Sequence, residues 1–188
     1  HMIASWKTQY YLRIESPYAT LGEGWYDANA PAIVSLSSAV ATENGTRHLF
    51  VQWSGDLSGV DANQTIIMSG PRFVSAVWTT QYELKIESEY GHTGGAGWYA
   101  PDIQAVFLVD TPIVDSGDGT RRVFTGWSRD AQGTEPQGTI LMDGPKVVRA
   151  NWGTQYQVVF ETRGIRNGTV LTISVDGQPY RVKVPERI

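Results

Sequence analysis

The sequence predicts an all-β, or nearly all-β, protein that contains two tandem copies of one small repeat. Three observations support this prediction: a five-residue phrase returns along the chain, apolar and polar residues alternate in several segments, and Asn-Gly or Asp-Gly pairs separate strand-like runs. Period-two alternation is typical of strands with one buried face. No segment shows the 3.6-residue apolar period of an amphipathic helix.

The repeat is marked by the phrase W-x-T-Q-Y, whose three tryptophans are spaced by 72 and then 74 residues. Between these marks, two full copies share four further motifs in the same order. The motifs are GWY (24–26, 97–99), F-x-x-W-S (50–54, 124–128), a T-I-x-M-x-G-P segment (65–71, 139–145) and V-x-A-x-W (74–78, 148–152). The predicted units are therefore residues 3–78 and 79–152.

A single strand is predicted across the junction between the two units, from about residue 73 to residue 88. Even positions from Val74 to Ile86 are mostly apolar, and odd positions are polar apart from Val77. Because the junction contains no Gly-Ser or Pro-rich linker, we expect little hinge freedom and a stiff rod of stacked units. Trp78 is expected in the seam between the units, and Tyr82 in the next core.

Two hairpins are predicted where ENGTR (43–47) and GDGTR (117–121) separate strand-like runs, since a type I′ turn needs positive φ at both central residues. The segments 55–64 and 129–138 are expected to be polar loops. In F-x-x-W, Phe50 and Trp53 would face opposite sides of a regular strand, unless a bulge intervenes.

Residues 153–188 depart from the repeat, because they carry neither GWY nor F-x-x-W. They contain two hairpin signals, Asn167-Gly168 and Asp176-Gly177, within alternating segments. Only 36 residues follow Trp152, too few for a third copy. This segment is either a shortened unit of another type or a small β cap on the second repeat.

Composition excludes several classes of function. The chain has 188 residues, a net charge of −4 and scattered Lys and Arg residues, so nucleic acid is a poor partner. No apolar stretch approaches the roughly 20 residues of a membrane span, and the lack of cysteine rules out disulfides and thiolate zinc sites. His1 and Met2 read as a cloning scar, so a fragment of a larger protein is expected.

Three sequons are candidate glycosylation sites, at Asn44, Asn63 and Asn167. Glycosylation of Asn-x-Ser/Thr occurs on surface loops of exported proteins. The sequons therefore favour an extracellular or cell-surface protein.

The ordered motifs Y-x-L-x-I, G-W-Y, F-x-x-W, M-x-G-P and V-x-A-x-W resemble the divergent internalin-B-type bacterial repeat. The resemblance covers residues 6–152 and implies small β-grasp-like or β-sandwich-like units, used in tandem as spacers, stalks or adhesion modules on secreted and surface proteins. It implies no catalysis. Since no segment here predicts the helix of a β-grasp unit, a plain β-sandwich is the alternative.

No catalytic constellation is evident from the residues, and we expect neither an enzyme nor a cofactor. His48 is replaced by Arg122 in the second copy, His92 has no counterpart in the first, and no G-x-S-x-G motif occurs. The acidic residues are spread along strands and loops, where solvated decoration is the ordinary interpretation.

Asp110, Asp115 and Asp118 are weak candidate calcium ligands, because carboxylates in a Gly-rich turn can bind this ion. The first copy has Ala41 in place of Asp115. A turn stabilised by Asp side chains is therefore preferred over a metal site.

The adjacent aromatic residues of GWY are the candidate ligand-binding residues: Trp25, Tyr26, Trp98 and Tyr99. Neighbours in a strand point to opposite faces, so one of each pair should be exposed or lie in the seam between units. Packing is the preferred role. An exposed flat ring would instead allow stacking on a sugar.

These observations predict a non-catalytic extracellular repeat fragment that acts as a rigid spacer or adhesion stalk, with neighbouring domains of the same chain as its partners. The alternative is a carbohydrate-binding module appended to a secreted glycoside hydrolase, with a polysaccharide or surface glycan as partner. Neither function involves nucleic acid or membrane insertion.

Overall fold

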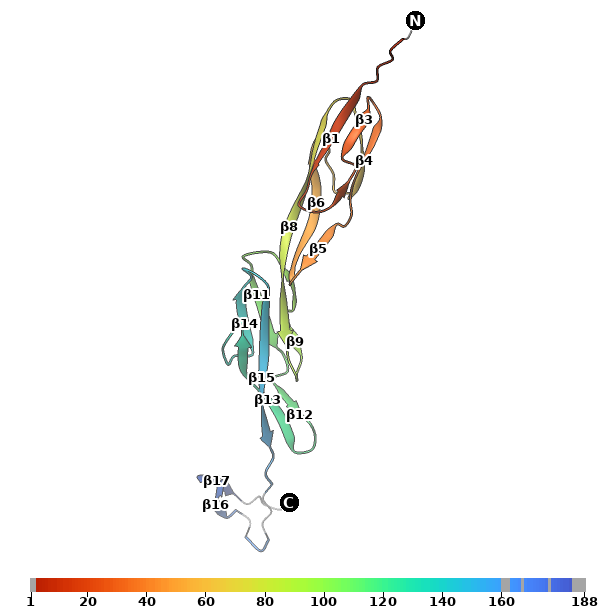
Figure 1. The fold of residues 1–188 in the computed structure, drawn as a ribbon. Coiled ribbons are helices and arrows are strands. Elements are labelled where there is room, and N and C mark those ends of the chain that lie inside the picture. Colours follow the sequence, from red (N-terminus) through yellow and green to blue (C-terminus); the bar gives the residue numbers. More distant parts are fainter. Residues whose placement is uncertain (1–2, 160–162, 167, 176, 184–188) are drawn as a thin grey trace.

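The computed structural model describes residues 3–159, 163–166, 168–175 and 177–183 (Figure 1). All regular structure in these ranges is β, which confirms the all-β prediction. Within the same ranges, no helix is present that could span a membrane. The strands are β1 (Gln9–Glu15), β2 (Thr20–Leu21), β3 (Gly24–Asp27), β4 (Pro31–Leu36), β5 (Val40–Glu43), β6 (Thr46–Gly55), β7 (Asn63–Ile67), β8 (Arg72–Glu87), β9 (Thr93–Gly94), β10 (Gly97–Tyr99), β11 (Gln104–Val109), β12 (Ile113–Asp115), β13 (Thr120–Arg129), β14 (Gln137–Leu141), β15 (Lys146–Tyr156), β16 (Val170–Val175) and β17 (Gln178–Lys183).

Strand pairings in the first sequence repeat recur in the second. In the first, strands pair in the order β5-β6-β8-β1-β3, beside a three-stranded antiparallel sheet β2-β4-β7. In the second, the order is β12-β13-β15-β8-β10, beside β9-β11-β14. Even the parallel pairs match, since Leu12 lies opposite Arg72 and its counterpart Leu84 lies opposite Lys146.

Strand β8 belongs to both sets of pairings, as its position along the elongated molecule in Figure 1 shows. Its 16 residues run without interruption from Arg72 to Glu87, which confirms the predicted junction strand. Val74, Ala76 and Leu84 on one face are buried, whereas Lys85 and Glu87 on the other are exposed. The alternation therefore continues through the junction.

Two separate groups of buried apolar residues lie on either side of the junction. Nine of their ten positions correspond in the repeat, and the counterparts of Ile14 and Phe124 are partly buried, so each copy buries its own core. The first contains Leu12, Ile14, Ala32, Val34, Leu36, Trp53, Ile66, Met68, Val74 and Ala76. The second contains Leu84, Ala105, Phe107, Val109, Phe124, Trp127, Ile140, Met142, Val148 and Ala150.

A bulge in the F-x-x-W motif brings its two aromatic rings together. The pairing register shifts between Phe50 and Gln52 on β6, and at the matching position of β13. Because the extra residue reverses the alternation, Phe50 and Trp53 share a face, with ring centroids 5.2 Å apart. Trp53 is 1% exposed, and its indole N–H donates to the carbonyl oxygen of Asp61 at 3.1 Å.

The two predicted hairpin turns differ in length. Asn44 and Gly45 have φ of 49° and 76°, which confirms the type I′ turn between β5 and β6. In the second copy the Ser116 N–H donates to the Thr120 carbonyl oxygen at 3.0 Å, so the loop there spans three residues, 117–119. The expected two-residue Asp118-Gly119 turn is therefore wrong, because Asp118 accepts a hydrogen bond from the Thr120 N–H and belongs to a wider loop.

The last part of the chain contains the hairpin of β16 and β17, with Gly177 at φ 78° in its turn. Asp176 and Asn167, the other predicted turn residues, lie outside the described residues. The two interpretations of this segment, a shortened unit or a cap, both stay open.

Replacement of Trp53 by Ala should lower the free energy of unfolding by about 3–5 kcal/mol, because it empties a packed core site. The matched control is Trp6→Ala, which removes the same side chain from a position that is 93% exposed. We expect a loss below about 0.5 kcal/mol there. Urea unfolding followed by circular dichroism measures both, and equal losses would contradict the assignment of Trp53 to the core.

Candidate functional site

The tryptophan of the W-x-T-Q-Y phrase at the junction packs against the repeat that ends there. The ring of Trp78 meets Phe50 and Tyr18 edge to face, with centroids 5.8 Å and 4.5 Å away. Trp78 thus packs against the first core and not between the two cores, which corrects the expectation that it fills the seam. Tyr82 packs against the second core, as predicted.

Thr80 and Gln81 of the phrase hold the neighbouring strand β6 from its two opposite faces. The hydroxyl oxygen of Thr80 lies 3.1 Å from Nδ1 of His48, and Oε1 of Gln81 accepts a hydrogen bond from Nε of Arg47 at 2.8 Å. The second copy repeats the second contact, since Arg121 Nε donates to Gln155 Oε1, also at 2.8 Å. At 78–82 and 152–156 the phrase therefore fastens the same pair of strands.

Arg47 also reaches across the junction to the second repeat. Its guanidinium carbon lies 4.5 Å from the ring centroid of Trp98, within the range of a cation–π contact. Nearby, the Glu83 N–H donates to the Gly45 carbonyl oxygen at 2.8 Å. A β-carbon on Gly45 would lie 2.9 Å from Cβ of Pro145. We call the residues Gly45, Arg47, Gln81, Trp98 and Pro145 the seam.

The aromatic pairs of GWY point to opposite faces, as expected. Tyr26 and Tyr99 pack against the two cores, and their hydroxyls donate to the carbonyl oxygens of Gly22 at 2.8 Å and Gly95 at 2.7 Å. Trp25 is 67% exposed, whereas Trp98 is half-buried. One tryptophan is thus exposed and the other lies in the seam.

Trp25 is the ring of this set that offers an open face for a ligand. It meets Tyr11 edge to face, with centroids 5.3 Å apart. The neighbouring Glu23 already accepts hydrogen bonds from the Tyr11 hydroxyl at 2.9 Å and the Ile14 N–H at 3.0 Å. A ligand on Trp25 would therefore find stacking area, next to a carboxylate that is already engaged.

Hydrogen bonds alter the acidity of the groups around Trp25. The Ile14 N–H, followed by the Tyr11 hydroxyl, lowers the pKa of Glu23 below its ordinary value. The same carboxylate raises the pKa of Tyr11. The ion pair with Lys7, and then the amide of Gln9, lower the pKa of Asp27. The two lowered values favour charged carboxylates, and the raised value favours the neutral hydroxyl of Tyr11.

The candidate calcium residues act as turn-forming side chains. Asp115 Oδ1 accepts a hydrogen bond from the Gly117 N–H and Asp118 Oδ1 accepts one from the Thr120 N–H, both at 2.9 Å. Asp110 Oδ1 accepts a hydrogen bond from the Thr111 hydroxyl at 3.0 Å. Among the described residues, no group of three His, Asp or Glu side chains could hold a metal ion.

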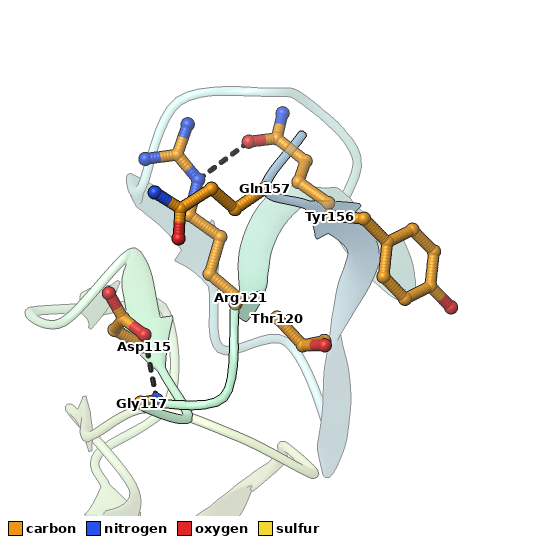
Figure 2. A pocket seen from close by; sticks show the side chains of 8 residues that line it. Asp115, Gly117, Thr120, Arg121, Tyr156 and Gln157 are labelled. Atoms are coloured by element: carbon orange, nitrogen blue, oxygen red, sulfur yellow. Dashed lines mark hydrogen bonds between the residues drawn. The ribbon is translucent and has the colours of Figure 1, made fainter. Parts of the chain in front are cut away.

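An open cavity of about 460 Å³ lies at the far end of the second repeat (Figure 2). Figure 2 shows Arg121, Tyr156 and Gln157 around it, with Asp115 bound to the turn backbone. The Gln157 N–H donates to the Gly119 carbonyl oxygen at 2.6 Å, which matches the bond from Glu83 to Gly45 in the seam. At the equivalent end of the first repeat, the second repeat fills the corresponding place.

The remaining candidate residues lie apart from one another. Asn44 is exposed in the β5–β6 turn and Asn63 is exposed at the start of β7, while Asn167 lies outside the described residues. His92 is exposed, and its carbonyl oxygen accepts a hydrogen bond from the Asp110 N–H. These positions form no common site.

Sequence reasoning missed Arg47 as a junction residue. The available signal was the dipeptide Thr-Arg, which returns at 46–47 and 120–121, opposite the glutamine of the recurring phrase.

The pKa of Glu23 should lie below its ordinary value, and Tyr11→Phe should raise it partway back, because one hydrogen bond to the carboxylate is removed. Because the folded-state pKa is lowered, ionised Glu23 stabilises the fold above its unfolded pKa, and this contribution is lost as the pH falls through the folded pKa. Carboxyl NMR titration of both proteins measures the shift. An ordinary pKa in the unsubstituted protein would contradict the bonding described.

Gly45→Ala and Gly119→Ala form a matched pair, since both positions have positive φ (76° and 83°). Each should lose about 1–2 kcal/mol to the left-handed conformation. Gly45→Ala should lose more, because its new methyl group meets Pro145, whereas at Gly119 the nearest atom is 3.7 Å away. Equal losses in urea unfolding would show that Gly45 and Pro145 are not in contact.

No family model, curated protein or solved structure matches this chain. The resemblance to the divergent internalin-B-type repeat therefore remains a prediction from the motifs quoted above.

Proposed function

We propose that the chain is a non-catalytic extracellular fragment whose two tandem sandwich-like repeats, residues 3–78 and 79–152, act as a rigid spacer or adhesion stalk, followed by a short β-unit at 153–188. The observation that carries this proposal is the uninterrupted strand β8, which pairs with β1 and β6 in one repeat and with β10 and β15 in the next. Every residue of β8 pairs with at least one neighbouring strand, and β6 alone pairs with it from residue 76 to residue 81, so no unpaired stretch is left as a hinge.

Contacts beside the strand support the same role. The pairing of β6 with β8 extends as far as Thr46 opposite Tyr82, where Tyr99 already pairs on the other side. At this level Arg47 covers the ring of Trp98, and Gly45 abuts Pro145. A hinge motion would have to separate all of these contacts at once. Stiffness is the property that a stalk needs in order to hold other domains away from a surface.

Carbohydrate binding is the second candidate, and the exposure of Trp25 is the observation that favours it. Sugar rings stack on exposed aromatic faces, and Trp25 is 67% exposed. The expected pair of platforms would need Trp98 as well, whose ring is covered by Arg47. One platform gives no avidity on a polymer, which makes the spacer the better supported function.

The stiffness proposal is tested by the double variant Arg47→Ala/Trp98→Ala in small-angle X-ray scattering. Because this variant lacks the seam contacts, only an ensemble of inter-repeat orientations should fit its scattering profile. The control, Arg121→Ala/Trp25→Ala, removes the same residue types away from the seam and should scatter like the unsubstituted protein. If the seam variant also scatters like that protein, the side-chain contacts of the seam do not stiffen the junction.

A further inference from the structure

Two tryptophans are exposed at the N-terminal end of the first repeat, although their counterparts at the junction are covered. Trp6 is 93% exposed and Trp25 is 67% exposed. Their counterparts, Trp78 and Trp98, are both half-buried. Each of the two tryptophan motifs, W-x-T-Q-Y and GWY, therefore has two environments within one chain, and the difference lies in what packs beside it.

Strand β6 contributes cover to both rings at the junction, and Tyr18 adds to the cover of Trp78. Strand β6 pairs with β8 from Thr46 opposite Tyr82 to Phe50 opposite Trp78. Phe50 packs on Trp78, and Arg47 lies over Trp98. One hairpin strand of the form T-R-x-x-F thus covers both rings.

The matching strand edge in the first repeat has no such neighbour among the described pairings. Strand β1 pairs with β3 from Gln9 to Leu12 on one side, but its pairing with β8 on the other side begins only at Leu12. Residues 9–11 of β1 thus present free backbone groups along one edge, and residues 6–8, which lead into β1, belong to no strand. Such an edge is a template for an added strand.

Side chains on this edge have the acceptor pattern of the seam. Gln9 stands in the place of Gln81, and its Nε2 donates to Asp27 Oδ1 at 3.0 Å, which leaves Oε1 to accept a hydrogen bond from an arginine as Gln81 does. Glu23, close to Trp25 in the sequence, has a lowered pKa and adds negative charge for an arginine, whereas Asp27 is already paired with Lys7. The edge therefore complements a cationic strand.

We infer that the edge of β1 at residues 9–11, the segment 6–8 that leads into it and Trp25 form a docking surface for the hairpin end of another repeat of this kind, carrying T-R-x-x-F. The occupant lies in the same chain, with its last strand running into Trp6 as the first repeat runs into Trp78. A separate copy cannot supply the strand, since its own Thr120–Phe124 segment already pairs with residues 152–156. This inference rests on the proposed function and names the partner of that end.

The test is a chain in which residues 3–77 are duplicated ahead of Trp6 and all tryptophans carry a 5-fluoro label. Substitution of Phe for Trp25 of the original copy assigns its ¹⁹F resonance. We expect that resonance to lose solvent exposure, as judged by its solvent isotope shift, and the amides of residues 6–10 to gain at least tenfold protection from hydrogen exchange. Arg47→Ala in the added copy should restore the exposure of Trp25 while the amides stay protected.

Three outcomes would overturn the inference. In the first, the added repeat folds, as shown by its circular dichroism, yet the original Trp25 stays exposed and the amides exchange freely. In the second, the unmodified chain forms concentration-dependent dimers in sedimentation that Trp25→Ala abolishes. In the third, soluble polysaccharides shift the Trp25 resonance of the unmodified chain saturably, which assigns the ring to sugar binding. The scattering test of the seam uses different residues, so it can succeed where this one fails.

Discussion

Continuous pairing of strand β8 with neighbouring strands along its whole length is the constraint on which the rest of the structure depends. The strand places Val74 in one core and Leu84 in the other, and its length fixes how far apart the two cores lie. Because side chains alternate without interruption, the outward face at Gln81 stays in register with Arg47 on β6 and Trp98 on β10. A slip of one residue would reverse both faces and empty both cores.

This constraint explains why the W-x-T-Q-Y phrase recurs. Tryptophan closes the core of the repeat that ends, threonine and glutamine fasten the hairpin strand beside it, and tyrosine opens the core of the repeat that follows. At 78–82 the phrase serves two cores at once, so a change in it would affect both sides of the junction. Selection on a single core would not require this combination of residues.

Local patterns were sufficient to predict β8, the Asn44-Gly45 turn and the opposite directions of Trp25 and Tyr26, because each depends on residues close in sequence. The contact between Arg47 and Trp98 could not be predicted, since it joins residues of different repeats across a third strand. Trp78 was placed in the seam because its phrase lies at the junction. The sequence allowed either a regular strand or a bulge in F-x-x-W, and it is the bulge that turns Phe50 toward Trp78.

The most direct test of a rigid junction is the distribution of distances between the two repeats. The chain has no cysteine, so spin labels can be attached at Ile33→Cys and Val106→Cys, which are equivalent exposed positions on β4 and β11. Double electron–electron resonance should give one narrow distance distribution, because β8 holds the repeats in a single orientation. A broad or bimodal distribution from the folded protein would contradict the account.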